Sequence, residues 1–330
     1  MLYSDALHAY IKEGNINGII DCHIATGDTL RMTGEFETAI THYNEALEIT
    51  EDSSGNQVTA ADCHCGIGLS YRALGDWKTA LQRLKKADKI YTKHEDRRGH
   101  AFTTWALAGT YRIKGDIQQA IETFNSALKE YRNLRDRRGI GYCYNGLGGA
   151  NRIAGNFKDS EKYYKKANQV FERLKDRFGR AYSYCGLGNS RRMVGDYHNA
   201  IDYFRKASRL YKKIGDRVSY AYTLWSIATT HKMKGRYRRA FRNLEKAESL
   251  FKGTNDPRGL IYCRLIYGEL RLLTGDRTGA RRLFRSGLNS AVKFGFKVEA
   301  AHARMLLELP PGYARLGIKL DFNNPPYNLP

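Results

Sequence analysis

Three groups of residues in this 330-residue chain could in principle do chemistry, and the first is the run Cys63-His64-Cys65. Thiolates and imidazoles bind zinc, but such sites need further ligands at characteristic spacing. No second cluster with ligand spacing occurs in the sequence. Neighbouring residues on a helix also point in different directions. The sequence therefore predicts no metal site.

The second group consists of glycine clusters, Gly146-Leu147-Gly148-Gly149 and Gly186-Leu187-Gly188. A dinucleotide site needs a strand before the glycines and a helix that begins at them, whereas these glycines fall inside a predicted helix. No nucleophile elbow, Walker motif or zincin motif occurs, and His23, His64 and His231 have no repeating carboxylate partner. We therefore expect no cofactor and no enzymatic activity.

The third group is a series of basic residues that recurs at one fixed spacing. Its members are Arg31, Arg72, Arg112, Arg152, Arg192 and Lys232. Such a series either binds an anionic partner or is solvated and keeps the protein soluble. Aromatic residues on the same predicted helix faces favour binding, because Tyr, Trp and Arg are enriched at binding hot spots.

The spacing of these cations follows an internal repeat. Each repeat has a marker glycine, followed five residues later by a small residue. The marker glycines are Gly34, Gly75, Gly115, Gly155, Gly195, Gly235 and Gly275, spaced by 41 residues once and by 40 residues five times. A fixed period of this size indicates a solenoid in which each hairpin contacts mainly its neighbours. Positions are numbered below from the marker glycine, so the cations stand at −3.

Small residues and large apolar residues occupy fixed positions around each marker glycine. Small residues stand at −7, +5 and +12, as in Gly188, Ala200 and Ala207, and large apolar residues stand at −8 and +9. This spacing predicts two helices joined by a glycine turn. The aspartates Asp96, Asp136, Asp176, Asp216 and Asp256 are expected to cap the first helix of their hairpins.

Two other positions hold small residues whose role is less obvious. Position −9 holds Gly66, Gly146 and Gly186, although glycine costs a helix about 1 kcal/mol relative to alanine. Either a neighbouring helix approaches closely there, or a ligand lies against bare backbone. Four of the six cysteines stand at −12, which indicates a packing slot for a small side chain. Unpaired thiols in this number predict a reducing, cytoplasmic location.

This pattern resembles the tetratricopeptide repeat family, over about residues 15–309. The 40-residue period and the D-R-x-G/S opening look most like the longer repeats of spindle-orientation adaptors, at AYSYCGLGN and GDYHNAIDYFRKA. The resemblance implies an all-α fold, a right-handed solenoid of stacked hairpins. It also implies that the first helices line a concave wall and that the protein is a scaffold or adaptor.

The concave wall is therefore the predicted binding groove. Its predicted residues are Arg72, Phe102, Trp105, Arg112, Tyr142, Asn145, Arg152, Tyr182, Asn189, Arg192, Tyr222, Trp225, Lys232 and Tyr262. The spindle-type repeats carry asparagines at positions corresponding to −9 and −6 that grip an extended peptide. Here −9 is mostly glycine or alanine, and −6 keeps only Asn189, so the peptide would be held differently.

Charge is distributed unevenly along the chain. The whole chain has a net charge of +21, residues 1–50 carry 2 Lys/Arg and 8 Asp/Glu, and residues 151–300 carry 34 Lys/Arg and 13 Asp/Glu. The middle and late repeats are therefore expected to attract an anionic partner. Our main hypothesis is an acidic protein segment bound in a basic, aromatic groove. The alternative is a single strand of RNA, with arginines on phosphates and tyrosines stacked on bases.

The repeats divide the chain into four parts. We expect an N-terminal helix at 1–14, seven repeats at 15–294, a capping helix at 295–311 and an extended tail at 312–330. The first helix is either a cap or part of a repeat from a longer chain. The tail is either frayed or an extended segment that binds the solenoid or another molecule. No run of 18 apolar residues and no secretory signal occurs, so no membrane partner is expected.

Overall fold

The computed structural model describes residues 2–52 and 57–308. These residues form helices and connecting turns, with no strand in either described range. The helices are α1 (Leu2–Glu13), α2 (Ile16–Thr33), α3 (Phe36–Asp52), α4 (Gln57–Ala73), α5 (Trp77–Lys93), α6 (Arg97–Lys114), α7 (Ile117–Asn133), α8 (Arg137–Ile153), α9 (Phe157–Leu174), α10 (Arg177–Met193), α11 (Tyr197–Ile214), α12 (Arg217–Met233), α13 (Tyr237–Lys252), α14 (Pro257–Leu273), α15 (Arg277–Phe294) and α16 (Lys297–Glu308).

The helices from α2 to α15 pair as seven antiparallel hairpins, α2 with α3 through α14 with α15. Each marker glycine lies in the turn inside a hairpin and has a positive φ, such as 91° at Gly34 and 97° at Gly115. The predicted aspartate caps are confirmed. Asp136 and Asp176, for example, accept hydrogen bonds from the backbone N–H groups of Gly139 and Gly179 at 2.9 and 2.8 Å.

The large residue at +9 explains the glycines at −7 and −9. The ring of Tyr164 on α9 lies against Gly148 of its own hairpin and against Gly186 of the next hairpin. A Cβ atom added at Gly186 would lie 2.1 Å from the Tyr164 ring, and one added at Gly148 would lie 3.0 Å from it. The −9 glycine therefore allows close approach of the neighbouring hairpin, which was one of the two expected explanations.

The cysteines at −12 are buried, as the packing-slot prediction requires. They are Cys22, Cys63, Cys143 and Cys263, each with 6% exposure or less. All six cysteines are free thiols.

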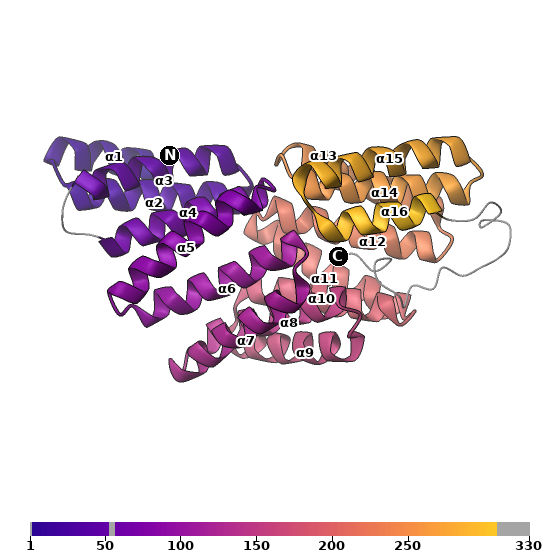
Figure 1. The fold of residues 1–330 in the computed structure, drawn as a ribbon, viewed down its shortest axis with the longest axis horizontal. Coiled ribbons are helices and arrows are strands. Elements are labelled where there is room, and N and C mark those ends of the chain that lie inside the picture. The colour runs from indigo at the N-terminus through magenta and orange to yellow at the C-terminus, as the bar shows by residue number, and fades with distance from the viewer. Residues whose placement is uncertain (1, 53–56, 309–330) are drawn as a thin grey trace.

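The solenoid turns back on itself, so that the first hairpin approaches the sixth (Figure 1), where α2 contacts α12. The indole N–H of Trp77 on α5 donates to the carbonyl oxygen of Phe294 on α15 at 2.9 Å. Lys297 Nζ lies 2.5 Å from Asp116 Oδ1, and Asn255 Nδ2 donates to Glu37 Oε1 at 3.2 Å. The hairpins still contact mainly their neighbours, as expected, and these contacts add a closure between early and late hairpins.

The ends of the array carry single helices. Helix α1 packs on α2, and α16 packs on α15 and α14. The predicted tail at 312–330 and the end of the predicted capping segment lie outside the described residues. Among the helices of the described ranges, none combines the length and apolar character needed to cross a membrane.

Candidate functional site

The superhelix encloses a central pocket of about 290 Å³. Its walls come from α4 to α14 and from Phe296, which precedes α16. Six of the fourteen predicted groove residues line this pocket. They are Arg72, Arg112, Arg152, Tyr182, Asn189 and Tyr222. The volume is at the lower end of the range for ligand sites.

Three arginines from consecutive hairpins form one wall of the pocket. Arg72, Arg112 and Arg152 stand at −3, at the ends of α4, α6 and α8. Arg72 Nη1 donates to the carbonyl oxygen of Ala106 at 3.3 Å. A Cβ atom added at Gly109 would lie 2.7 Å from Arg72 Nη1. The glycine at −6 in one hairpin thus makes room for the guanidinium of the hairpin before it.

Burial and mutual repulsion shape the electrostatics of this wall. Burial lowers the pKa of Arg72 to about 10, and the neighbouring Arg112 and Arg31 cations lower it as well. Burial also lowers the pKa of Arg192 to about 9, and the Arg152 cation adds to this shift. Because positive charge is disfavoured here, an anion that enters the pocket would be stabilised.

Tyrosines and an amide face the same space. Tyr182 and Tyr222 are half-buried and line the pocket, and the ring centroid of Tyr222 lies 4.8 Å from that of Phe251. Asn189 Oδ1 accepts a hydrogen bond from Arg192 Nη2 at 3.1 Å. The pocket can therefore offer charged donors and aromatic surface to one ligand.

Four other predicted groove residues do not line the pocket, and the rings of three of them lie close to one another. The ring centroids of Phe102 and Trp105 are 5.7 Å apart, and those of Trp105 and Tyr142 are 6.0 Å apart. Tyr142 Oη donates to Asp176 Oδ2 at 3.5 Å. Asn145 is fully buried, and within the described ranges neither polar atom of its amide has a hydrogen-bond partner.

The four remaining predicted residues are buried in the later hairpins. Arg192 is 1% exposed and its guanidinium lies over the ring of Trp225, 5.8 Å from the centroid. Lys232 forms a buried ion pair with Glu269. Tyr262 donates to Glu299, which also pairs with Arg258. The structure therefore places these four side chains in internal contacts rather than around the pocket.

Sequence reasoning did not assign Asp256, Arg258 and Phe296 to the groove, although all three line the pocket. Asp256 was expected only as a helix cap, and it does accept from the N–H of Gly259 at 2.9 Å. Burial raises its pKa. The carboxyl group of Asp256 and the guanidinium of Arg258 therefore add one acidic and one basic group to the pocket lining. A repeat pattern carries no signal for Phe296, because only the closure of the superhelix brings it there.

Comparison with known proteins begins with a family model. Residues 22–93, 100–173 and 179–253 match the model described as tetratricopeptide repeat. No curated protein matches the chain.

Solved structures supply similar folds at low sequence identity. A Rap protein complexed with Competence and Sporulation Factor is 18% identical, with a TM-score of 0.70 over 88% of this chain and 80% of that chain. The Rap conjugation gene regulator of plasmid pLS20, in complex with the Phr* peptide, is 16% identical, with a TM-score of 0.71 over 86% and 76%. NprR in complex with its cognate peptide NprX is 17% identical, with a TM-score of 0.64 over 90% and 85%.

Proposed function

Because this chain belongs to the tetratricopeptide repeat family, we propose that it is a peptide-binding adaptor whose central pocket holds an acidic segment of a partner protein. The observation that carries the proposal is the convergence of Arg72, Arg112 and Arg152 on one pocket. Guanidinium groups bind carboxylates through two parallel hydrogen bonds, which are stronger than bonds between neutral groups.

Two further observations support a peptide as the ligand. Two proteins of similar fold were solved in complex with peptides, Phr* and NprX, and a third was solved with Competence and Sporulation Factor. The pocket also combines arginines with half-buried tyrosines, which suits a segment carrying both acidic and apolar side chains. Binding rather than catalysis fits a family that is defined by packing positions.

The test uses a fluorescent synthetic peptide rich in Glu, Asp and Leu, and a copy in which every acid is replaced by its amide. We expect the full chain to bind the acidic peptide and to lose about tenfold or more in affinity in the variant R72Q/R112Q, because each tenfold loss corresponds to 1.4 kcal/mol. Fluorescence anisotropy at two salt concentrations measures this.

A matched control separates the pocket from the general positive charge of the chain. Arg238 and Arg239 are exposed on α13, so R238Q/R239Q removes the same charge elsewhere. If both double variants bind equally well, the pocket is not the site. If single-stranded RNA displaces the acidic peptide and binds more tightly than it does, the same groove serves the alternative ligand and the proposed function is wrong.

A further inference from the structure

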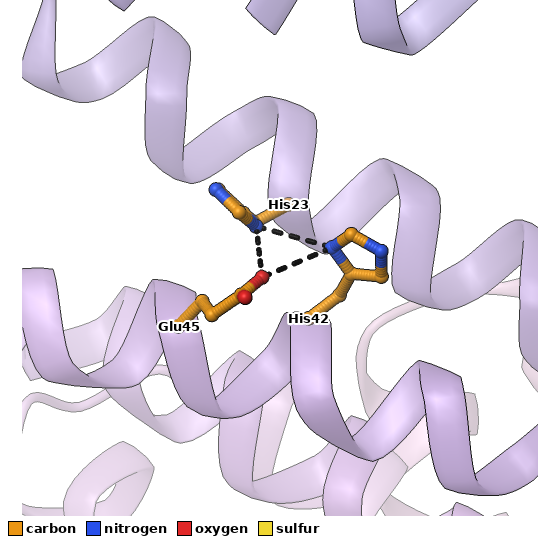
Figure 2. Close-up of side chains that lie close together, drawn as sticks. All are labelled: His23, His42 and Glu45. Atoms are coloured by element: carbon orange, nitrogen blue, oxygen red, sulfur yellow. Dashed lines mark hydrogen bonds and ion pairs between the residues drawn. The ribbon is translucent and has the colours of Figure 1, made fainter. Parts of the chain in front are cut away.

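Two histidines and a glutamate converge on the first hairpin, away from the central pocket (Figure 2). His23 projects from α2, and His42 and Glu45 project from α3. His23 Nδ1 lies 3.2 Å from His42 Nδ1 and 2.8 Å from Glu45 Oε2, and His42 Nδ1 lies 3.2 Å from Glu45 Oε2. Two ring nitrogens and a carboxylate oxygen thus form a small triangle.

The size of this triangle matches one face of a tetrahedral metal site. Zinc bonds of 2.0–2.1 Å to nitrogen and oxygen place the donor atoms about 3.3 Å apart at tetrahedral angles. The three observed separations lie slightly below that value. Little movement is therefore needed for all three atoms to bind one ion.

The other repeats show that these positions are distinctive in the first hairpin. His23, His42 and Glu45 stand at −11, +8 and +11. In the fifth hairpin the same positions hold Tyr184 and Tyr203, whose rings stack, and Lys206, whose Nζ lies 5.4 Å from both ring centroids. In the fourth hairpin the same positions hold Tyr144 and Tyr163, whose rings are tilted with centroids 6.1 Å apart, and Lys166, whose Nζ lies 5.5 Å from the centroid of Tyr144.

The second hairpin shares the histidine at −11 with the first hairpin, but it lacks the other two metal-binding side chains. It holds His64 at −11, but Arg83 and Lys86 at +8 and +11. Arg83 Nη1 lies 3.4 Å from His64 Nδ1, so a cation occupies the place where an ion would bind. Only in the first hairpin do all three positions carry imidazole or carboxylate groups, which are common ligands of zinc.

We propose that His23, His42 and Glu45 bind a divalent transition-metal ion of the zinc class. Three protein ligands and a remaining open position are typical of sites that keep a water or accept a further ligand. Two imidazoles and one carboxylate favour such ions over magnesium or calcium, which prefer oxygen ligands alone. The acidic first 50 residues, with 8 Asp/Glu against 2 Lys/Arg, also favour a cation there.

The site is accessible and its occupation would have a structural effect. The side chains of His23, His42 and Glu45 are 12%, 27% and 45% exposed. A bound ion would link α2 to α3 in the hairpin at one end of the solenoid, which packs on α1 and on the second hairpin and meets α12 where the superhelix closes. A ligand that binds only the folded state stabilises it by an amount that grows with the logarithm of its concentration relative to its Kd.

The experiment uses the full chain after treatment with a chelator, with Zn²⁺ and Co²⁺ as the ions. We expect calorimetry to detect one tight Zn²⁺ site, and H42Q and E45Q each to weaken it by about tenfold or more. Circular dichroism checks that both variants remain folded. The control is H198Q, because His198 is 85% exposed and faces Asp202 at 3.7 Å without a third ligand.

Two outcomes would overturn the proposal. Equal Zn²⁺ affinity in wild type, H42Q and E45Q would place the ion elsewhere. Co²⁺ bound by this site should give visible bands of a nitrogen and oxygen ligand set, so a thiolate charge-transfer band would assign the ion to cysteines instead.

Discussion

At the scale of single residues, a tyrosine ring at +9 links two of the hairpins to the hairpin that follows. Tyr164 is clamped between Gly148 and Gly186, and Tyr43 is clamped between Gly27 and Gly66 in the same way. Each ring therefore fills the space that side chains at the two glycine positions would otherwise occupy. The helix-propensity cost of glycine, about 1 kcal/mol per residue, is offset by burial of an aromatic ring.

This arrangement predicts opposite effects for two nearby glycines. Gly186→Ala should destabilise the fold by about 1–3 kcal/mol, because its Cβ atom would lie 2.1 Å from the Tyr164 ring. Gly149→Ala should be neutral or stabilising, because its Cβ atom would lie 3.4 Å or more from its neighbours and alanine favours helix. Urea denaturation measures both. Equal effects would contradict the clamped-ring explanation.

A buried histidine predicts how stability depends on pH. Burial lowers the pKa of His64 to about 4, and the Lys86 and Arg83 cations lower it as well. Since the unfolded pKa is about 6.5, the unfolded chain binds this proton more tightly. Stability should therefore fall as pH drops from 6.5 to 4, by up to about 3 kcal/mol from this residue.

The comparison that checks this is wild type against His64→Leu, in urea denaturation at several pH values. The variant should show a weaker decline between pH 6.5 and 4, whatever its stability at neutral pH. An identical decline would mean that other groups cause the acid sensitivity.

At the scale of elements, the turns between hairpins contain left-handed residues that are not all glycine. Lys175 has a φ of 53° and Arg135 a φ of 55°, whereas Gly215 and Gly295 occupy the equivalent positions in later repeats. Left-handed backbone costs non-glycine residues about 1 kcal/mol or more. The chain therefore contains this turn in two forms, one with glycine and one with a larger residue in the left-handed position.

A reciprocal exchange follows from these turns. Lys175→Gly should stabilise the protein by about 1 kcal/mol, and Gly215→Lys should destabilise it by a similar amount. At Gly215 an added Cβ atom meets no atom within 4 Å, so only the backbone conformation would change in energy. Thermal melts of the two variants measure the effect. A shift of the same sign in both would contradict it.

Helices, caps and turns could be predicted from the sequence because their causes are local. The Asp caps, the marker glycines and the small residues at −9 each depend on residues within one or two hairpins. The burial of the basic series could not be predicted in the same way. Lys232 carries the same pattern as Arg72, but it pairs with Glu269 at −6 of the next hairpin, a position that holds no acidic residue in the second to sixth hairpins.

At the scale of the whole molecule, closure of the superhelix decides which predicted residues form a pocket. Arg72 and Phe296 are far apart in the chain and line the same space. Repeat periodicity gives the order of the hairpins, but the rotation from one hairpin to the next depends on many small packing differences. The basic wall of the pocket could therefore be predicted from the sequence. The residues that the closure brings opposite this wall could not.

The closure rests on few contacts, so it should be possible to weaken it without unfolding the hairpins. The Trp77 indole bonds to Phe294, and Lys114 Nζ lies 5.1 Å from the centroid of the Trp77 ring. Lys297 pairs with Asp116, which precedes α7. The variant W77A/K297D removes the indole and places like charges together.

We expect W77A/K297D to have a larger radius of gyration in small-angle scattering and unchanged helical circular dichroism. Cys185 is half-buried and lines the pocket, so its labelling by a thiol reagent should become about tenfold faster if opening becomes easier by 1.4 kcal/mol. W77A/K293D is the control for charge, because Lys293 is exposed near the same contact. It should open the protein less than W77A/K297D does. Unchanged dimensions and labelling in W77A/K297D would mean that these contacts between early and late elements do not hold the superhelix closed.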